Sequence, residues 1–250
     1  MPLASPAVER VRAAWARLLS LGDRPFPHAG VHHVTRPVLT VRVVALGDGV
    51  VVAAPDAVGA RLTSTLAPDE LTRAEAVGGV LGHLVQEVIG VADLAYASDL
   101  APGAASAADD PAVAEVAPRD ARLDALREDC PPREWHESGV ADLEPRFGTE
   151  DAAGALAAVA GYTVWVGRIA HIGVLAHPRA RGTGQARAVA ARAVRDALAR
   201  GLVPQWRAAR GNPASAALGR RLGFLPLGAQ LTMTLWASPS DRAPRDAPVA

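Results

Sequence analysis

Apolar and polar residues alternate along the chain in patterns that predict both helices and strands. Residues 6–21 carry apolar side chains at helical spacing, and residues 169–176 form a short apolar run typical of a buried strand. Two apolar runs, 38–46 and 50–54, flank Gly47-Asp48-Gly49, which predicts a β-hairpin. In residues 227–236, Leu and Met alternate with Gln and Thr, as in a half-exposed strand. The chain therefore reads as a mixed α/β protein.

The same patterns predict the remaining elements. We expect helices over 55–66, 68–77, 119–129 and 133–139, and strands over 93–97, 113–117, 156–166 and 205–209. Residues 80–91 are apolar but compatible with either helix or strand, and residues 24–37 read as a polar connector.

Composition changes between residues 101 and 111, where the sequence APGAASAADDP is small and acidic and contains Pro, Gly and Ser. We expect a linker there. The predicted organisation is an N-terminal α/β lobe over 1–100, this linker, a second domain over 112–237 and a flexible tail over 238–250.

The stretch from Arg168 to Leu227 carries the strongest functional signal. After the strand at 169–176, His177-Pro178 ends the run, and the sequence Arg179-Ala180-Arg181-Gly182-Thr183-Gly184 leads into a long Ala-rich helix. Glycines let the backbone approach a ligand closely, and the first N–H groups of a helix lack internal acceptors. The two arginines add positive charge suited to phosphate. This layout predicts an anion site.

A second motif follows the strand at 205–209. Asn212-Pro213 opens another helix, because Asn is a favoured N-cap and Pro a favoured first helical residue, and Leu222-Gly223-Phe224 ends it. Together, Arg179-x-x-Gly182-x-Gly184 and the segment 212–224 resemble the GNAT superfamily of acyl-CoA N-acyltransferases, over residues 111–237.

This resemblance implies a fold and a ligand. The implied fold is a GNAT-like mixed, mostly antiparallel sheet flanked by helices, preceded here by a smaller α/β N-terminal lobe that could itself be a degenerate GNAT-like half. The implied co-substrate is acetyl-CoA, without a metal. Backbone N–H groups after the strand would hold the pyrophosphate, and the strand end would pair with the pantetheine amides. The expected cofactor-binding residues are Val174, Leu175, Ala176, Arg179, Arg181, Gly182, Thr183, Gly184, Gln185, Ala186, Arg187 and Asn212.

A purely structural role for these residues stays open. Gly182 and Gly184 can simply serve a tight turn, and Asn212 can simply cap its helix.

Acetyl transfer to an amine requires a base for the amine and a proton for the departing thiolate. His171 is the first candidate base, because neutral His suits this task near pH 7, and Glu137 is the second. A hydrogen-bonded His on a sheet face and a solvated helical carboxylate are the structural alternatives. Gly219 stands where many GNAT members carry the Tyr that acts as general acid. Water or another group must then serve, or the protein is not a catalyst.

The helix over 133–139 is expected to roof the acceptor pocket, with Glu134, Trp135 and His136 lining it. The prediction is an N-acetyltransferase that acts on a primary amine of a small molecule or peptide by direct attack in a ternary complex. The alternative is a non-catalytic acyl-CoA-binding or sensing module. A nucleotide-binding P-loop is excluded, because the chain contains no Lys.

Charge and cysteine content narrow the partners and the compartment. The formal net charge is zero, which argues against nucleic acid as a partner. Cys130 is the single cysteine, so no internal disulfide forms. With no signal-peptide pattern and no long apolar run, the sequence predicts a cytoplasmic protein without membrane contact.

Three further points contribute less to the functional prediction. His28, His32 and His33 could bind a metal, but no Cys or carboxylate at regular spacing supports them, so a polar connector is favoured. All basic residues other than His are Arg, which indicates a GC-rich bacterial genome. A homodimer is an open alternative.

Overall fold

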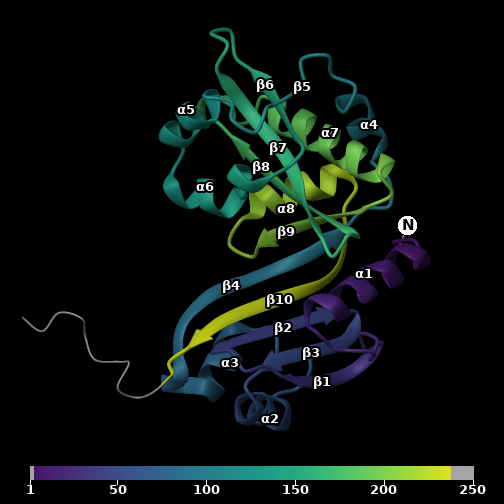
Figure 1. Cartoon of the computed structure of the whole chain (residues 1–250), viewed down its shortest axis with the longest axis vertical. Helices are drawn as coiled ribbons and strands as arrows, with labels where there is room; N and C mark the ends of the chain where they lie inside the picture. The colour runs from purple at the N-terminus through teal and green to yellow at the C-terminus, as the bar shows by residue number, and fades with distance from the viewer. Residues whose placement is uncertain (1–2, 238–250) are drawn as a thin grey trace, which may run out of the picture. The chain divides into compact units, whose positions relative to one another are not determined.

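The computed structural model describes residues 3–237, and the chain divides into two compact units (Figure 1). The first unit combines the N-terminal segment up to Leu18 with Leu94–Pro226, and the second combines Leu19–Asp93 with the segment from Leu227 onward. This division differs from the predicted boundary at 101–111, which lies inside the first unit. The predicted tail, 238–250, lies outside the described residues.

The predicted linker contains a helix, α4 (Pro102–Ala107). Pro102 occupies the first helical turn, where its missing N–H costs nothing, and Ala104 and Ala108 are buried in the core of the first unit. The small residues of this segment resemble a flexible linker in sequence, but in the structure they let α4 pack closely against the core.

The sheet of the first unit has parallel and antiparallel parts. Strands β8 and β9 are parallel, whereas β5–β6, β6–β7 and β7–β8 are antiparallel, and the end of β4 lies beside β9. The strands are the end of β4 (Val85–Tyr96), from Leu94 onward, with β5 (Ala114–Glu115), β6 (Arg146–Glu150), β7 (Leu156–Trp165), β8 (Ile169–Ala176) and β9 (Val203–Ala209). The strands predicted over 156–166 and 169–176 are confirmed as β7 and β8, and they pair antiparallel with each other.

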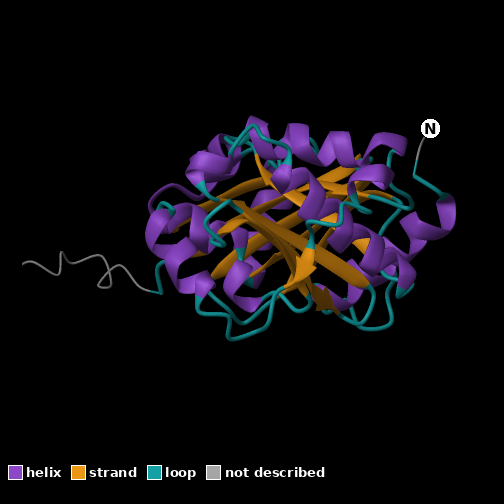
Figure 2. Cartoon of the chain, turned by 90° about the horizontal axis from the view of Figure 1, so that it is seen from above, coloured by secondary structure: helices purple, strands orange, loops and turns teal. Residues whose placement is uncertain are grey.

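Helices flank this sheet (Figure 2). They are α1 (Ser5–Leu18), α4, α5 (Arg122–Asp129), α6 (Pro132–Ser138), α7 (Gln185–Ala199) and α8 (Pro213–Leu222). Alternate residues of β8 enter two different cores: Ala170 and Ile172 pack in the cluster that contains α7, and Leu175 packs in the cluster that contains Trp135 of α6. The odd-numbered residues of β8 therefore face α6.

The second unit is a smaller α/β body. Its strands β1 (Ala29–Thr35) and β3 (Asp48–Ala54) pair in parallel, and β2 (Thr40–Leu46) pairs antiparallel with β3 and with β10 (Leu225–Leu235). Its helices are α2 (Asp56–Thr65) and α3 (Ala74–Leu81). The hairpin predicted around residues 47–49 is confirmed.

Two predictions for the second unit differ from the structure. Residues 29–35, predicted as a connector, form β1, whose seven residues include only one buried side chain, so the apolar signal of a strand is missing. The helix predicted over 68–77 begins only at Ala74. Residues 80–91 divide between the end of α3, a turn at 82–84 and the start of β4.

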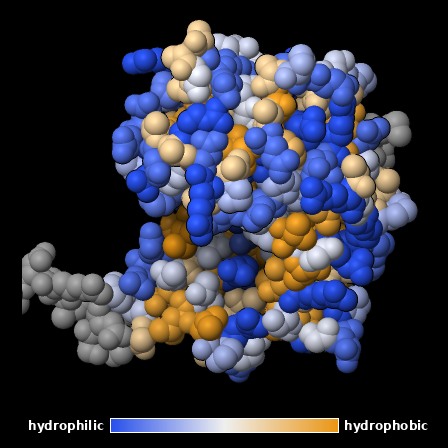
Figure 3. All heavy atoms as spheres, turned by 45° about the horizontal axis from the view of Figure 1, so that its top comes forward, coloured by the Kyte–Doolittle hydropathy of each residue, from blue (hydrophilic) through white to orange (hydrophobic). Residues whose placement is uncertain are grey.

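Some large hydrophobic side chains stay exposed among the described residues. Figure 3 shows one face of the molecule, with hydrophobic residues in orange scattered between hydrophilic residues in blue. The exposed large hydrophobic residues are Val38, Leu39, Val88, Ile89 and Val164. Within residues 3–237, no helix has both the length and the apolar character needed to cross a membrane.

Candidate functional site

The parallel pairing of β8 with β9 is short. It joins Ile169 to Val203, Ala170 to Pro204 and His171 to Gln205, although both strands continue beyond these pairs. On its other side, β8 stays paired with β7 as far as Ala176. An inner strand directs its backbone groups to both neighbours in turn. Residues 172–176 therefore present backbone groups that β9 does not satisfy, and we call this segment the unpaired edge of β8.

A glycine turn follows the unpaired edge and leads into α7. Gly182 has a φ of +79° and Gly184, the N-cap of α7, a φ of +92°. A Cβ atom at either position would meet nothing within 4 Å, so backbone conformation and not crowding favours glycine there. The turn thus ends with the N-terminus of a 15-residue helix, which carries partial positive charge.

The N–H groups at the start of α7 divide into engaged and available ones. Those of Arg187 and Ala188 donate to the carbonyl oxygen of Gly184. Gln185 and Ala186 lie earlier in the first turn, where the helix offers no carbonyl oxygen to their N–H groups. These two N–H groups are therefore better placed than that of Arg187 to bind an anion.

Two polar contacts join the turn to α5 and α6. Arg181 donates from Nη2 to Glu134 Oε2 of α6 at 2.7 Å, and both side chains remain more than 40% exposed. His177 accepts the N–H of Arg179 at Nδ1, at 3.1 Å, and its Nε2 lies 3.3 Å from Asp129 Oδ2 at the end of α5. The structure therefore brings Glu134, predicted for the acceptor pocket, together with Arg181, predicted for the phosphate.

The other predicted cofactor residues have clear local roles. Thr183 donates its hydroxyl to Ala180 O at 2.7 Å, and Gln185 Oε1 accepts from Thr149 of β6 at 2.8 Å. Asn212 caps α8, because its Oδ1 accepts the N–H of Ser215 at 3.0 Å. Val174 and Ala176 are half-buried on the unpaired edge, whereas Leu175 is buried.

His171 occupies the last paired position before the unpaired edge. Its Nδ1 lies 3.2 Å from Gln205 Oε1, and its ring stacks on Trp165 with 4.3 Å between centroids and 25° between planes. Burial, with the positive charge of Arg207, lowers the pKa of His171 to about 4. The imidazole is therefore neutral at physiological pH. As an odd-numbered residue of β8, it faces the side covered by α6.

The candidate residues of α6 differ in their surroundings. Glu137 accepts from Arg133 Nε at 2.7 Å in an exposed ion pair, and His136 is also exposed. Trp135 is half-buried and packs against the core cluster under α6. Of the two candidate bases, only His171 lies on the sheet next to the unpaired edge.

Gly219 is buried, and a neighbouring side chain fills the space that a side chain at this position would occupy. A Cβ atom there would lie 2.9 Å from Cδ1 of Trp206, on the neighbouring strand β9. The Trp206 indole is held by a hydrogen bond of 3.1 Å from its Nε1 to Ser215 Oγ. The space that a tyrosine at position 219 would need near its Cβ is therefore occupied by an indole ring.

Sequence reasoning missed three residues that are connected to His171 by hydrogen bonds. Gln205 and Tyr96 are 0% exposed and Trp15 is 2% exposed, and their polar atoms form a connected chain of hydrogen bonds that ends at His171. Trp15 and Tyr96 look like ordinary core positions in the sequence. The one available signal was the single Gln within the otherwise apolar start of the strand at 203–206.

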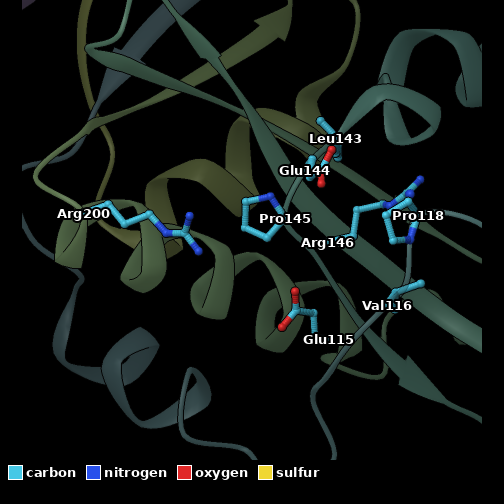
Figure 4. A pocket seen from close by; sticks show the side chains of 8 residues that line it. All are labelled: Glu115, Val116, Pro118, Leu143, Glu144, Pro145, Arg146 and Arg200. Atoms are coloured by element: carbon cyan, nitrogen blue, oxygen red, sulfur yellow. The ribbon is translucent and has the colours of Figure 1, made fainter.

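A cavity of about 270 Å3 lies at the edge of the sheet near β5 and β6. Figure 4 shows Glu115 and Arg200 pointing into it from opposite sides, with Pro145 between them. None of the sequence-predicted site residues lines this cavity. Its lining residues are Glu115, Val116, Pro118, Leu143, Glu144, Pro145, Arg146 and Arg200.

The histidines considered as metal ligands lie near or within β1. His33 Nε2 lies 3.5 Å from the carbonyl oxygen of Ala54, and its ring occupies the space above Gly59 of α2. In residues 3–237, no group of three or more His, Cys, Asp or Glu side chains is arranged to hold a metal ion.

Part of the chain matches a known protein family. Residues 151–228 match the family model described as GNAT acetyltransferase. That range contains β7, β8, the glycine turn, α7, β9 and α8. Among curated proteins, the search finds no match.

Solved structures give a similar result for the fold. A GCN5-related N-acetyltransferase from Kribbella flavida matches with a TM-score of 0.51 and 17% identity, over 94% of this chain and 98% of that one. A protein described as a GNAT-family acetyltransferase from Novosphingobium aromaticivorans is 27% identical over 61% of this chain and 67% of that chain, with a TM-score of 0.47. A tandem GNAT protein from the clavulanic acid biosynthesis pathway matches with 16% identity and a TM-score of 0.45, over 80% of this chain and 65% of that one. The match to the Kribbella flavida structure confirms the mixed sheet flanked by helices as the fold.

Proposed function

We propose that the protein is an N-acetyltransferase that moves the acetyl group of acetyl-CoA to a primary amine, because residues 151–228 match the GNAT acetyltransferase family model. The acceptor is a small molecule or a peptide, and its amine attacks the thioester directly in a ternary complex. The observation that carries this proposal is the short β8–β9 pairing, which leaves an unpaired strand edge directly before the glycine turn and α7.

The donor site uses backbone groups more than side chains. The unpaired edge, residues 174–176 above all, is the segment that pairs with the amides of pantetheine. The N–H groups of Gly182, Gly184, Gln185 and Ala186, at the positive end of α7, receive the pyrophosphate. Arg179 and Arg181 supply charge, and phosphate competes with Glu134 for Nη2 of Arg181.

His171 is the proposed base. The acceptor ammonium first loses one proton to water, because only the neutral amine has a lone pair that can attack. As this nitrogen attacks, the C–N bond forms and the nitrogen becomes positively charged, which makes its remaining proton far more acidic than in the free ammonium. A neutral imidazole of low pKa can accept the proton at that stage. The C–S bond then breaks, and the CoA thiolate takes its proton from water, because Gly219 leaves no tyrosine to supply it.

The acceptor faces α6 in this proposal. Glu134 is the carboxylate of α6 that becomes available when Arg181 turns to phosphate, and it suits a cationic amine. Trp135 and His136 lie on the same helix.

A non-catalytic acyl-CoA-binding module is the second candidate. The packing of Trp206 against Gly219 favours it, because this packing excludes the usual acid from its family position. A non-catalytic module would bind acyl-CoA at the unpaired edge of β8 and the glycine turn, without acetyl transfer. A cytoplasmic location, a bacterial source and a homodimer stay predictions from the sequence.

Thermal-shift titration with acetyl-CoA, CoA and ATP tests the donor site. A ligand at about 100 times its dissociation constant adds roughly 2.7 kcal/mol to stability, which gives a clear rise in Tm. Both CoA compounds should raise Tm and ATP should not. The matched variant Gly184→Val should lose the shift, because a β-branched residue at a φ of +92° displaces the first N–H groups of α7.

A panel of primary amines with acetyl-CoA then separates the two functions. Free CoA release that depends on the amine identifies the transferase. If acetyl-CoA binds but no amine in the panel causes release of CoA, the result supports the non-catalytic acyl-CoA-binding module. If neither CoA compound binds, both functions are wrong, and the glycine turn serves the fold alone.

A further inference from the structure

A chain of buried polar atoms crosses the first unit and ends at His171. Trp15 Nε1 of α1 donates to the hydroxyl oxygen of Tyr96, at the end of β4, over 2.7 Å. Gln205 Nε2 of β9 donates to the same oxygen, also over 2.7 Å. Gln205 Oε1 lies 3.2 Å from His171 Nδ1. We call Trp15, Tyr96 and Gln205 the Gln205 bridge.

With the Gln205 amide oriented as in the structure, Nε2 toward Tyr96 and Oε1 toward His171, the donor and acceptor types in this bridge determine the position of a proton. An indole N–H can only donate, so the oxygen of Tyr96 must accept from Trp15. The amide nitrogen of Gln205 also faces that oxygen, which turns its carbonyl oxygen toward His171. A carbonyl oxygen only accepts, so the contact of 3.2 Å is a hydrogen bond only if Nδ1 carries the proton. Nε2 of His171 then holds the free lone pair.

We propose that the Gln205 bridge holds His171 in its Nδ1-protonated tautomer, so that Nε2 is the atom that takes the proton from the acceptor amine. Gln205 and Tyr96 are positioning residues, which act through His171 and touch no substrate. This inference rests on the proposed function for the role of His171, whereas the tautomer itself does not depend on catalysis.

Burial and stacking make this arrangement specific. Gln205 and Tyr96 are 0% exposed, so breaking one link leaves a polar group without water, at a cost of about 1–3 kcal/mol. Trp165 stacks on the imidazole and fixes the plane of the ring. The hydrogen bond to Gln205 fixes which edge of the ring faces β9. Because His171 and Gln205 are the last β8–β9 pair, the fixed ring stands at the start of the unpaired edge.

The proton transfer balances with this tautomer. The amine nitrogen forms a bond to the acetyl carbon, and the C–S bond breaks with its electron pair on sulfur. The nitrogen loses one proton to Nε2, which makes the ring an imidazolium that the neutral carbonyl oxygen of Gln205 stabilises through Nδ1–H. The imidazolium then returns this proton to water, and the thiolate gains one from water.

Nitrogen NMR of the full chain tests the tautomer directly. The ring nitrogens of histidine have distinct 15N shifts in the two neutral tautomers, and the His171→Gln variant identifies the signals. At pH 7 we expect Nδ1 protonated and Nε2 unprotonated in His171. A proton on Nε2 instead would overturn the proposal, whatever the activity of the protein.

Kinetics of variants test the positioning role. Gln205→Leu should lower kcat about tenfold or more, with an unchanged KM for acetyl-CoA, because the base is misplaced while the donor site is intact. Gln205→Glu keeps an acceptor oxygen against Nδ1 and should retain most of the activity that Gln205→Leu loses. Its carboxylate should also move the acidic limb of the pH–rate profile upward, although Arg207, the nearby cation, opposes part of that rise.

Tyr96 has a matched control on the other face of the same sheet. Tyr162 is also buried, and its hydroxyl donates to Asp196 of α7 over 2.5 Å. Tyr96→Phe should lower kcat, and Tyr162→Phe should not. Equal effects, or wild-type kcat in Gln205→Leu, would overturn the proposal. If the wild-type protein acetylates no amine, the proposed function fails, and the NMR measurement still decides the tautomer.

Discussion

At residue scale, Gly219 shows how packing can replace a functional residue. The family resemblance leads one to expect a tyrosine there, yet the indole of Trp206 fills the space in front of the glycine. The hydrogen bond to Ser215 and the ring contact with Phe224, 5.4 Å between centroids, both hold that indole. The sequence alone shows that the tyrosine is missing, but not that its space is occupied.

Gly219→Ala should therefore destabilise the protein, although alanine is the better helix former. Overpacking costs typically about 1–3 kcal/mol and the helix propensity of alanine returns about 1 kcal/mol, so we expect a net loss of up to about 2 kcal/mol in urea unfolding. Gly211→Ala is the control, because a Cβ atom there meets nothing within 4 Å. It should be neutral or slightly stabilising. Equal stability of the two variants would contradict the packing argument.

His171 should also make stability depend on pH. Its folded-state pKa is about 4, below the ordinary value of 6.5, so the unfolded chain binds more protons between these values. Stability is fully present above pH 6.5 and is lost as pH falls toward 4, by up to about 3 kcal/mol. Chemical unfolding at several pH values measures this slope. His171→Gln should flatten this slope, and an unchanged slope in that variant would contradict the assignment to His171.

At element scale, α6 and the glycine turn are joined through one exposed ion pair. Arg181 contacts Glu134 through Nη2, so a phosphate that binds this part of the guanidinium competes with Glu134 for it. This pair contributes little to stability, because exposed ion pairs contribute about 0–1 kcal/mol.

Glu134→Gln should accordingly bind CoA more tightly, by roughly fivefold if the lost competition amounts to about 1 kcal/mol. Isothermal titration measures the affinity. Glu137→Gln removes a carboxylate of the same helix that pairs with Arg133 instead, and should leave the affinity unchanged. A weaker affinity in Glu134→Gln would show that Glu134 orients Arg181 for the ligand.

The elements around the glycine turn could be predicted because their signals are local. The apolar run of β8, the glycines and the Asn-Pro start of α8 each lie within a few residues, and the structure has all three elements. β1 could not be predicted, because its pairing with β3 is remote in sequence and its side chains are mostly exposed. α4 could not be predicted, because its alanine-rich sequence resembles that of a flexible linker.

At the scale of the whole molecule, the first unit takes segments from both sides of the second. α1 and the end of β4 supply Trp15 and Tyr96, and the remainder comes from residues after 96. Tyr96 and Gln205 are 109 positions apart, so no local pattern could reveal their contact. The part of the site that depends on such contacts was therefore beyond sequence reasoning.

A fragment that begins at residue 112, after the predicted linker, should not fold cooperatively. It lacks α1, the end of β4 and α4, and would expose the buried amide of Gln205 and the alanine face of α7. Far-UV circular dichroism on heating should show a gradual change, whereas the full chain should show a sigmoidal transition. A sigmoidal transition in the fragment would support the boundary at 101–111.

The interleaving of the two units also constrains the order of events on the ribosome. The second unit receives strand β10 only after the last helix of the first unit, α8, has been synthesised, although its other strands emerge more than a hundred residues earlier. Until β10 has been synthesised, the valine-rich strand β2 has one edge without a partner strand, and this edge can pair with other chains. Nascent chains should therefore depend on chaperones that shield such edges, and slow translation before residue 225 should increase aggregation.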